Sequence, residues 1–306
     1  MNNEEPPGGG YPLSNFHSGF VAILGRPNVG KSSLMNAFVG EKVAIVSDRP
    51  QTTRNKILGV AGTGDWQIVF VDTPGLHKPR TKLGEYMVKS ANSAREGVDA
   101  VLVVVDAQHV SEGDRAILRD VGQMRCPKFL AVNKVDLVGP EQLLPALASL
   151  KDAGFDPIVP VSAMRGDNLD TLLNALAAAM PEGPRYFPDD MITDQPERII
   201  CAEIIREKAL NHLREEIPHG VGVEMLSIEK LSDTLTEIHA NLYCERASHK
   251  SIIIGRQGAM LGRIGAQARV DIERLLGTKV MLKLWVKVRE DWRNRQGDLR
   301  ALGYED

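Results

Sequence analysis

The fold of this chain follows from one stretch, Gly25-Arg26-Pro27-Asn28-Val29-Gly30-Lys31-Ser32. It has the spacing Gly-x-x-x-x-Gly-Lys-Ser and lies between an apolar run at residues 20–24 and a helical pattern that starts near Ser33. Gly25 and Gly30 allow backbone turns that are closed to other residues, so successive N–H groups can converge on phosphate oxygens. Lys31 would then reach the terminal phosphates, and the Ser32 hydroxyl would hold magnesium. The stretch therefore predicts a phosphate-binding loop.

Length and composition indicate a globular chain of about two domains. The 306 residues are 43% hydrophobic and 25% charged, which is ordinary for such proteins. No apolar run approaches the ~18 residues that span a membrane, and the N-terminus lacks a basic region followed by an apolar one. We therefore expect a cytoplasmic protein. Cys126, Cys201 and Cys244 are scattered without a Cys-x-x-Cys motif, which indicates reduced, partly buried thiols.

Opposite charges accumulate in two parts of the chain. Residues 246–300 contain thirteen Lys and Arg against five Asp and Glu, a balance of +8, whereas the remainder contains 24 against 35, a balance of −11. A basic block of this kind indicates an anionic partner, such as nucleic acid or a membrane surface. A solvated charged face is the alternative.

Apolar runs alternate with helical patterns after a tail at residues 1–18, which we predict to be disordered because it contains few apolar side chains. Runs rich in Val and Ile, typical of a parallel sheet covered on both faces, occur at 20–24, 67–71, 100–105, 128–132 and 157–161. Between them we expect helices around 32–38, 83–96, 113–124, 141–153 and 169–180. This alternation predicts a doubly wound α/β domain over residues 19–183, with its ligand at the carboxyl ends of the strands.

Polar motifs follow the expected strands at that edge. Asp72-Thr73-Pro74-Gly75 comes after the run at 67–71, where Asp72 can hold the water shell of magnesium and the Gly75 N–H can approach the terminal phosphate. In the polar connection before it, Gln51-Thr52-Thr53-Arg54, a threonine can complete the magnesium shell when a third phosphate is present. Thr53 is our first choice and Thr52 the alternative.

Two further motifs predict recognition of a guanine base. Asn133-Lys134-Val135-Asp136 follows the run at 128–132, and Asp136 is suited to accept from the N1–H and exocyclic amine of guanine, donors that adenine does not present together. Ser162-Ala163 follows the run at 157–161, and its backbone could contact the guanine carbonyl.

With these motifs, residues 20–180 resemble the translation-factor-like branch of the GTPases. Asn-Val-Gly-Lys-Ser, Thr-Thr-Arg and Asp-Thr-Pro-Gly-Leu are similar to the motifs of its TrmE-Era group. The resemblance implies a GTPase that binds GTP or GDP with Mg²⁺ at Ser32, Thr53 and Asp72. It implies catalytic roles for Lys31, Thr53, Asp72, Gly75 and Asn28. The nucleotide contacts it implies are Gly25, Arg26, Pro27, Asn28, Val29, Gly30, Lys31, Ser32, Ser33, Asp72, Thr73, Pro74, Gly75, Leu76, Asn133, Lys134, Asp136, Ser162 and Ala163.

One position departs from the Ras-like pattern in a way that bears on mechanism. Ras-like proteins have a water-orienting glutamine after Asp-x-x-Gly, and here the residue is Leu76, which cannot hydrogen-bond. We therefore expect slow intrinsic turnover. Asn28 matches the position that ligates K⁺ in the potassium-activated members of the group, so K⁺ is a second candidate cofactor. Arg26 and Arg54 are the alternatives for that positive charge.

A second domain is predicted after a break. Pro181 and Pro184 end the last helix, residues 184–196 read as a polar linker, and residues 197–306 form the second domain. A helix is expected from about 199 to 210, and strands at 221–229 and 237–245. The second strand alternates with the period of a sheet that has one wet face, with Ile238, Ala240, Leu242 and Cys244 inward and Glu237, His239, Asn241 and Tyr243 outward.

The basic block then carries Gly255-Arg256-Gln257-Gly258 between two helical patterns, followed by a strand at 279–288 with Leu282, Leu284, Val286 and Val288 inward. A Gly-x-x-Gly loop with a basic residue lets the backbone approach nucleic-acid phosphates, as in K-homology domains. A helix-turn-helix connection is the alternative. The order of elements resembles the prokaryotic (type II) K-homology domain, for which the RNA-binding candidates are Gly255, Arg256, Gln257, Gly258, Lys250 and Arg263.

The pairing of one GTPase domain with one K-homology domain resembles the Era-type bacterial GTPases over nearly the whole chain. The resemblance implies a monomer that binds small-subunit (16S) ribosomal RNA near its 3′ end, assists assembly of the 30S subunit from its precursor, and associates peripherally with the inner membrane. A constitutive RNA-binding module in which GTP only stabilises the fold is one alternative. Another is a membrane-associated regulator of growth or cell cycle, with Lys283, Lys287, Arg289, Arg293 and Arg295 facing anionic lipid.

Overall fold

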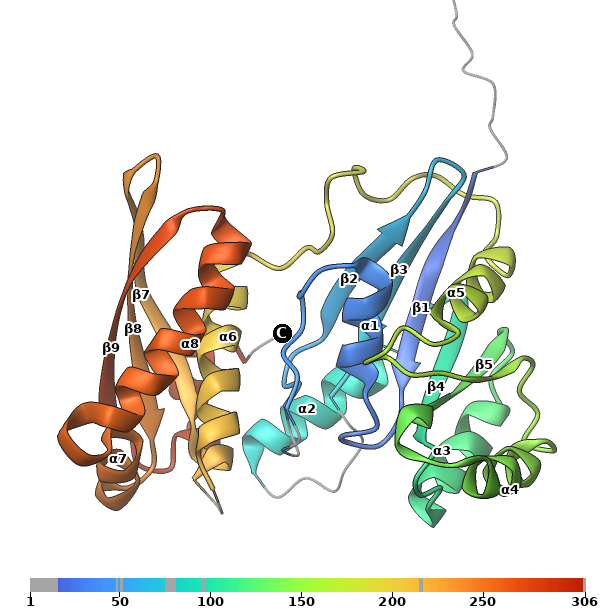
Figure 1. Cartoon of the computed structure of the whole chain (residues 1–306), viewed down its shortest axis with the longest axis horizontal. Coiled ribbons are helices and arrows are strands. Elements are labelled where there is room, and N and C mark those ends of the chain that lie inside the picture. The colour runs from blue at the N-terminus through green and yellow to red at the C-terminus, as the bar shows by residue number, and fades with distance from the viewer. Residues whose placement is uncertain are drawn as a thin grey trace, which may run out of the picture.

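The five apolar runs of the first half and one further strand form a six-stranded sheet, shown at the right of Figure 1 in a computed structural model. The structure describes residues 16–47, 49, 52–74, 81–94, 97–214 and 217–304, so the predictions for residues 1–15, Gln51, Gly75 and Leu76 lie outside the described residues. The strands are β1 (His17–Leu24), β2 (Ile57–Gly62), β3 (Trp66–Asp72), β4 (Ala100–Asp106), β5 (Lys128–Asn133) and β6 (Ile158–Pro160), in the order β2-β3-β1-β4-β5-β6.

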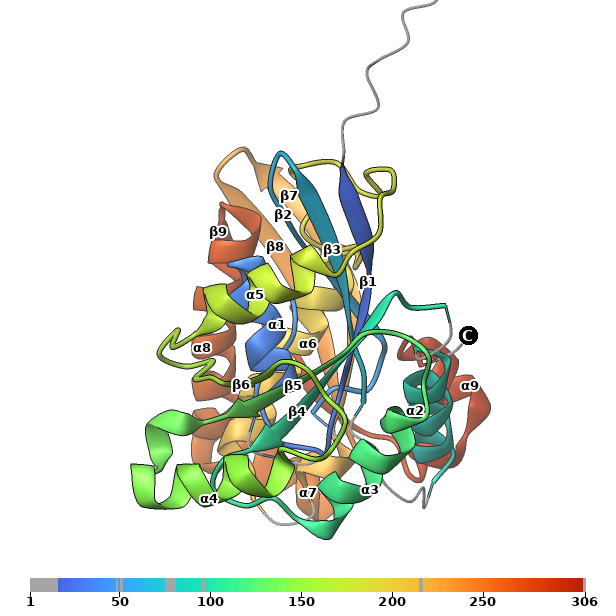
Figure 2. The same cartoon turned by 90° about the vertical axis from the view of Figure 1, so that its right-hand side faces the viewer.

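Helices cover both faces of this sheet, as the doubly wound prediction requires (Figures 1 and 2). One face packs against α1 (Lys31–Val39) and α5 (Leu169–Ala178), and the other against α3 (Glu112–Gly122) and α4 (Pro140–Leu150). The remaining helix of this domain, α2 (Lys82–Ser93), packs against the end of the chain. Since both faces are covered, the central strand β4 buries every side chain from Ala100 to Val105.

The sheet is parallel, as expected, except at one edge. Strand β2 pairs antiparallel with β3 and was not predicted from the sequence. Its six residues, Ile-Leu-Gly-Val-Ala-Gly, include two glycines and lack the alternation or long Val/Ile run that indicates a strand. The linker at residues 184–196 covers the outer edge of this strand. The Val60 N–H donates to the Ile192 carbonyl (2.8 Å), and Thr193 Oγ1 donates to the Leu58 carbonyl (2.6 Å).

The predicted tail extends too far, because β1 begins at His17. The Ser18 side chain is fully buried and donates to the Pro184 carbonyl (2.6 Å), while the ring of His17 bonds the Met180 carbonyl (2.9 Å). These partners lie more than 160 residues away in the sequence, so the local composition could not indicate them.

The second domain has the predicted order of elements. It consists of α6 (Glu197–His212), β7 (Gly222–Ser232), β8 (Leu235–Cys244), α7 (Ala247–Ile254), α8 (Ala259–Leu276), β9 (Lys279–Val288) and the short α9 (Gln296–Ala301). Strand β8 pairs antiparallel with β7 and parallel with β9, and α6 and α8 pack on one face of this sheet. Two free cysteines, Cys201 and Cys244, are buried in this core, and burial raises the pKa of the Cys201 thiol to about 12.

Two details of this sheet differ from the prediction. Asn241 and Tyr243, expected on a wet face, are 1% and 4% exposed, because both bond Glu224 and because Arg289 lies 4.1 Å above the Tyr243 ring. Val288, expected inward, is 37% exposed, since it ends the edge strand.

Within the described part of the chain, no helix combines the length and hydrophobicity needed to cross a membrane.

Truncating the core of the second domain should destabilise that domain alone. Ile264 is fully buried on α8, so Ile264→Ala should lower its free energy of unfolding by about 2–5 kcal/mol. Urea unfolding followed by circular dichroism, with and without GDP, would measure this loss. Val270→Ala on the exposed side of the same helix is the control and should change stability by less than about 0.5 kcal/mol. A loss of GDP binding in Ile264→Ala at low urea would contradict independent cores.

Candidate functional site

The phosphate-binding loop connects β1 to α1, and its backbone needs both glycines. Gly25 and Gly30 have φ of +151° and +98°, which residues with a side chain rarely adopt. A Cβ on Gly30 would lie 2.2 Å from Asn133 Nδ2, and one on Gly25 would lie 2.5 Å from the Val104 carbonyl oxygen. The loop thus lies directly against the following strands, and α1 begins at Lys31, where unpaired helical N–H groups favour an anion.

Lys31 is buried inside this loop with only 6% of its surface exposed. Its ammonium group donates to the carbonyls of Gly25 (3.2 Å) and Arg26 (3.0 Å). Burial lowers the pKa of Lys31, and the charge of Asp72 opposes that shift. A cation held at the floor of the loop is placed to meet the phosphates of a nucleotide.

Three oxygen-bearing side chains from separate segments meet beside it. Ser32 Oγ donates to Asp72 Oδ2 (2.6 Å) and lies 2.9 Å from Thr53 Oγ1, which is 3.3 Å from the same carboxylate oxygen. The other oxygen, Asp72 Oδ1, is buried and has no hydrogen-bond partner among the described residues. Burial raises the pKa of Asp72, and the charge of Lys31 and the two hydroxyls oppose that rise. This set of hard oxygen donors, with one carboxylate oxygen unsatisfied, fits Mg²⁺.

The structure distinguishes between the two threonines that the sequence left open. Thr52 Oγ1 donates to the carbonyl of Arg49 (2.6 Å), whereas Thr53 Oγ1 lies with Ser32 and Asp72. Thr53 is therefore the threonine at the candidate magnesium site.

The base-recognition motifs are held together by side-chain contacts. Asn133 Nδ2 donates to the Val29 carbonyl of the phosphate loop (2.9 Å), and Asn133 Oδ1 accepts from the Ala163 N–H (3.1 Å). Asp136 Oδ1 accepts from Ser162 Oγ (2.7 Å). Asn133 thus connects the phosphate loop with the loop after β6. The ion pair of Lys134 with Asp106 (2.8 Å) involves a residue that the sequence motifs did not indicate.

A pocket of about 410 Å³, within the range of small-molecule sites, is lined by Lys31, Ser32, Thr53, Asn133 and Asp136 among others. Its walls also contain residues that no motif predicted, Ile45, Val46, Ser47, Leu137 and Met164. Ile45 to Ser47 follow α1 in a segment without regular structure, so only the tertiary fold brings them to the pocket. Two other predicted nucleotide contacts, Val29 and Thr73, are buried and do not line the pocket. Thr73 Oγ1 donates to the Ile23 carbonyl (3.1 Å).

Neither alternative to Asn28 lies at the pocket. Arg26 forms an ion pair with the buried Asp114 (2.8 Å), and Arg54 is 1% exposed among residues of the second domain. Asn28 itself lines the pocket and has a left-handed backbone, with φ of +65°. Of the three candidates, only Asn28 is placed to contribute to a cation site there.

The Gly-x-x-Gly loop of the second domain leads from α7 into α8. Gly255, Gln257 and Gly258 have φ of +72°, +51° and +81°, so the backbone turns sharply and α8 starts at Ala259. Arg256 and Arg263 are exposed and Lys250 is half-buried. Among the residues that the structure describes, none of these three forms an ion pair.

A groove of about 440 Å³ runs from this loop between α8 and the edge strand β9. Small residues of α8 leave room in it, and apolar side chains of β9 form the other wall. It is lined by Gly258, Leu261, Gly262, Gly265, Ala266, Arg269, Val280, Met281, Leu282 and Leu284. A groove with an apolar wall, beside a glycine loop and exposed arginines, fits single-stranded nucleic acid, which combines flat bases with a charged backbone.

Both domains match known protein families. Residues 20–134 match the family model described as 50S ribosome-binding GTPase, and residues 216–293 match the KH domain model. GTPase Era from Alkaliphilus metalliredigens is 53% identical over 294 residues, which cover 95% of this chain and all of the relative.

Solved structures give the same result over the same length. A crystal structure of Era in complex with MgGDPNP and nucleotides 1506–1542 of 16S ribosomal RNA has a TM-score of 0.90 and 39% identity, covering 95% of this chain and all of that chain. A variant of Era from Aquifex aeolicus, bound to GDP and aluminium fluoride, has a TM-score of 0.89 at 38% identity, with the same coverage. With 53% identity to a GTPase Era over nearly its whole length and matches to both domain models, this chain belongs to the Era family of GTPases.

Proposed function

We propose that this chain is a GTP-hydrolysing switch that binds small-subunit ribosomal RNA near its 3′ end and assists assembly of the 30S subunit. The observation that carries the proposal is the presence, in one chain, of the nucleotide pocket and the K-homology groove. A relative of TM-score 0.90 was solved with MgGDPNP and 16S ribosomal RNA nucleotides 1506–1542, which supports the same ligands here.

In the nucleotide pocket, Ser32, Thr53 and Asp72 would hold Mg²⁺, which neutralises charge between the phosphates when bound. Lys31 and the helical N–H groups at the start of α1 bind the phosphates, and Asp136 selects guanine. Leu76, which lies outside the described residues, cannot orient the attacking water, so the unassisted turnover is slow.

In the second domain, the backbone at Gly255 to Gly258 would clamp the RNA phosphates while bases lie in the groove between α8 and β9. Since each phosphate contact releases counterions, RNA affinity should fall steeply with salt. We propose that GTP and GDP set different RNA affinities, with the constitutive RNA-binding module as the alternative.

Membrane contact has a weaker basis in this chain. Of the five cations considered for lipid, Lys283 pairs with Glu237 (2.5 Å), Arg289 with Asp298 (3.5 Å) and Arg293 with Glu245 (2.5 Å). Since these charges are already partnered by carboxylates, RNA is the better supported partner of the second domain. Peripheral membrane association of a cytoplasmic monomer remains a secondary proposal.

Base selection can be tested at Asp136. Asp136→Asn replaces an acceptor oxygen by a donor that faces the donors of guanine, so two charge-assisted hydrogen bonds are lost. GDP affinity should fall by roughly 100-fold or more, measured by isothermal titration calorimetry with magnesium. Leu137→Ala, which changes the neighbouring pocket wall, is the control and should lose less than about tenfold. Equal losses in the two variants would refute base recognition by Asp136.

The RNA surface can be tested at Gly258. Gly258→Asp adds strain at φ +81° and a negative charge facing the RNA phosphates, so affinity for a 16S 3′-end oligonucleotide should fall at least about tenfold. Fluorescence anisotropy at several salt concentrations would measure it. Gly277→Asp, at the other end of α8 with φ of +65°, matches both the strain and the charge and should bind RNA normally. Equal weakening by both changes would place the RNA elsewhere.

Asn28 offers a test of potassium as a cofactor. Asn28→Ala should reduce the stimulation of GTP hydrolysis by KCl over NaCl, while GTP affinity changes less than about threefold, because the side chain would ligate the cation rather than the nucleotide. Phosphate release in the two salts and nucleotide titration would separate these quantities. Proportional loss of both would make Asn28 merely a structural residue of the loop.

A further inference from the structure

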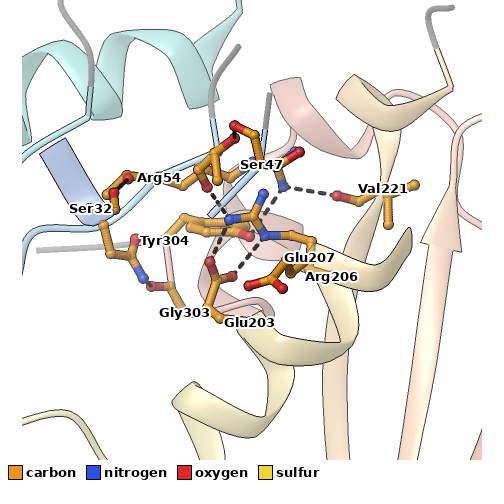
Figure 3. A network of polar contacts seen from close by, with 12 residues as sticks. Ser32, Ser47, Arg54, Glu203, Arg206, Glu207, Val221, Gly303 and Tyr304 are labelled. Carbon is orange, nitrogen blue, oxygen red and sulfur yellow. Dashed lines mark hydrogen bonds and ion pairs between the residues drawn. The ribbon is translucent and has the colours of Figure 1, made fainter. Parts of the chain in front are cut away.

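The segment that carries Thr53 lies between the nucleotide pocket and the second domain. Figure 3 shows its neighbour Arg54 together with Arg206 and Val221 of the second domain. Thr53 Oγ1 faces Ser32 and Asp72 of the first domain. The residues on both sides of it, Thr52 and Arg54, are bonded to the second domain instead. The candidate magnesium ligand is therefore held in place by contacts from two domains.

Arg54 makes more interactions with the second domain than Thr52 does. Its guanidinium group lies 5.5 Å from the ring centre of Trp292 and 5.6 Å from that of Tyr304. Nη1 donates to the Val221 carbonyl (2.9 Å) and the Tyr304 hydroxyl (3.2 Å), and Nη2 donates to the His219 carbonyl (3.2 Å). A buried guanidinium with fixed acceptors and aromatic faces has few alternative positions, so it fixes the backbone that carries it.

Arg206 of α6 holds the other side of Thr53. It is fully buried, and its Nη2 donates to the carbonyl of Thr52. Glu203, one turn earlier on the same helix, orients this guanidinium by accepting from Nε (2.8 Å). The carbonyl before Thr53 and the side chain after it are thus both held by the second domain.

The chain leading to Thr53 is held by α6 and by α8 of the second domain. The Val46 N–H donates to Glu207 Oε2 (3.1 Å), and Arg49 Nη2 donates to the Leu213 carbonyl (3.1 Å) at the end of α6. Lys42 pairs with both Glu207 and Asp271 (2.8 Å each). Ordering a loop costs backbone conformational entropy at every residue that is fixed. Here the second domain contributes contacts that offset part of this cost.

We infer that Arg54 and Arg206 are positioning residues of the GTPase site, through which the second domain holds Thr53 where it ligates the magnesium of bound GTP. This inference rests on the proposed role of Thr53. With this role, the K-homology domain helps to form the GTPase site and does not only respond to the nucleotide bound there. Because coupling between sites is reciprocal, magnesium and GTP that hold Thr53 in place also strengthen the contact between the domains.

The test measures the Mg²⁺ concentration that half-maximally slows dissociation of a fluorescent, non-hydrolysable GTP analogue from the full chain, and the same quantity for fluorescent GDP. In Arg54→Ala the value for the GTP analogue should rise by roughly tenfold or more, as for other residues that orient metal ligands. The value for GDP should change by less than about twofold, because Thr53 completes the magnesium shell only with the third phosphate. Arg54→Lys, which keeps the charge but not the paired carbonyl contacts, should lie between Arg54→Ala and the wild type.

A milder variant and a matched control guard against loss of fold. Tyr304→Phe removes the hydroxyl that accepts from Arg54 and keeps the ring. It should raise the Mg²⁺ requirement for the GTP analogue by about threefold. Asn294→Ala is the control, because Asn294 Oδ1 accepts from the Lys82 N–H (3.2 Å) in the same domain contact without touching residues 52–54. It should leave both values unchanged.

The positioning role of Arg54 and the role of Thr53 as a magnesium ligand can fail separately in these experiments. The inference fails if folded Arg54→Ala shifts the Mg²⁺ requirement equally for the GTP analogue and for GDP. It also fails if Asn294→Ala shifts the requirement as much as Tyr304→Phe does. Either result would show that the contacts of Arg54 and Arg206 only join the domains. Thr53→Ala tests the underlying role, since it should raise the Mg²⁺ requirement for the GTP analogue alone. If Thr53→Ala has no such effect, the assignment of Thr53 as a ligand fails, whatever the Arg54 variants do.

Discussion

The buried carboxylate of Asp72 is the constraint on which the nucleotide site depends. A carboxylate taken out of water is costly unless opposite charge and hydrogen-bond donors surround it. Here the donors come from α1 through Ser32 and from the segment before β2 through Thr53, while Lys31 supplies the charge. The same oxygen thus brings together three segments that the chain order separates, and Asp72 Oδ1 is left as an acceptor for a cation and its water shell.

The second constraint is the pair of buried arginines at the contact between the domains. Among the residues that the structure describes, Arg54 contacts carbonyl oxygens and aromatic rings, and burial lowers its pKa from the usual value. Arg206 is paired with Glu203, and the neighbouring carboxylates raise its pKa against the opposing effect of burial. Removing one partner of such a buried group leaves an uncompensated charge, so this contact resists separation of the domains.

The groove of the second domain adjoins the same boundary through α8, the helix that lines it. Asp271 of α8 pairs with Lys42, which lies just after α1 of the first domain. The groove lies along α8 and the Gly-x-x-Gly loop precedes it, so both adjoin a helix that contacts Lys42. Helix α2 adds a second contact, since Leu83 and Met87 pack with Trp292, Leu299 and Tyr304. The proposed RNA groove and the nucleotide pocket therefore lie on elements that share one packed boundary.

The sequence by itself determined the chemistry of the two sites and the order of the elements. A Gly-x-x-x-x-Gly-Lys-Ser loop, Asp72, Asp136 and a Gly-x-x-Gly turn have steric or donor–acceptor requirements that few residue types satisfy, so local spacing was enough to predict them. Strand β2, the burial of Asn241 and Tyr243, and the pocket walls at Ile45 to Ser47 were decided by partners far away in the chain. Arg54 shows the difference most clearly. Its place beside Thr53 suggested a charge for the phosphates, but only the tertiary structure turned its side chain into the second domain, where Trp292 and Tyr304 offered a better environment for a desolvated guanidinium.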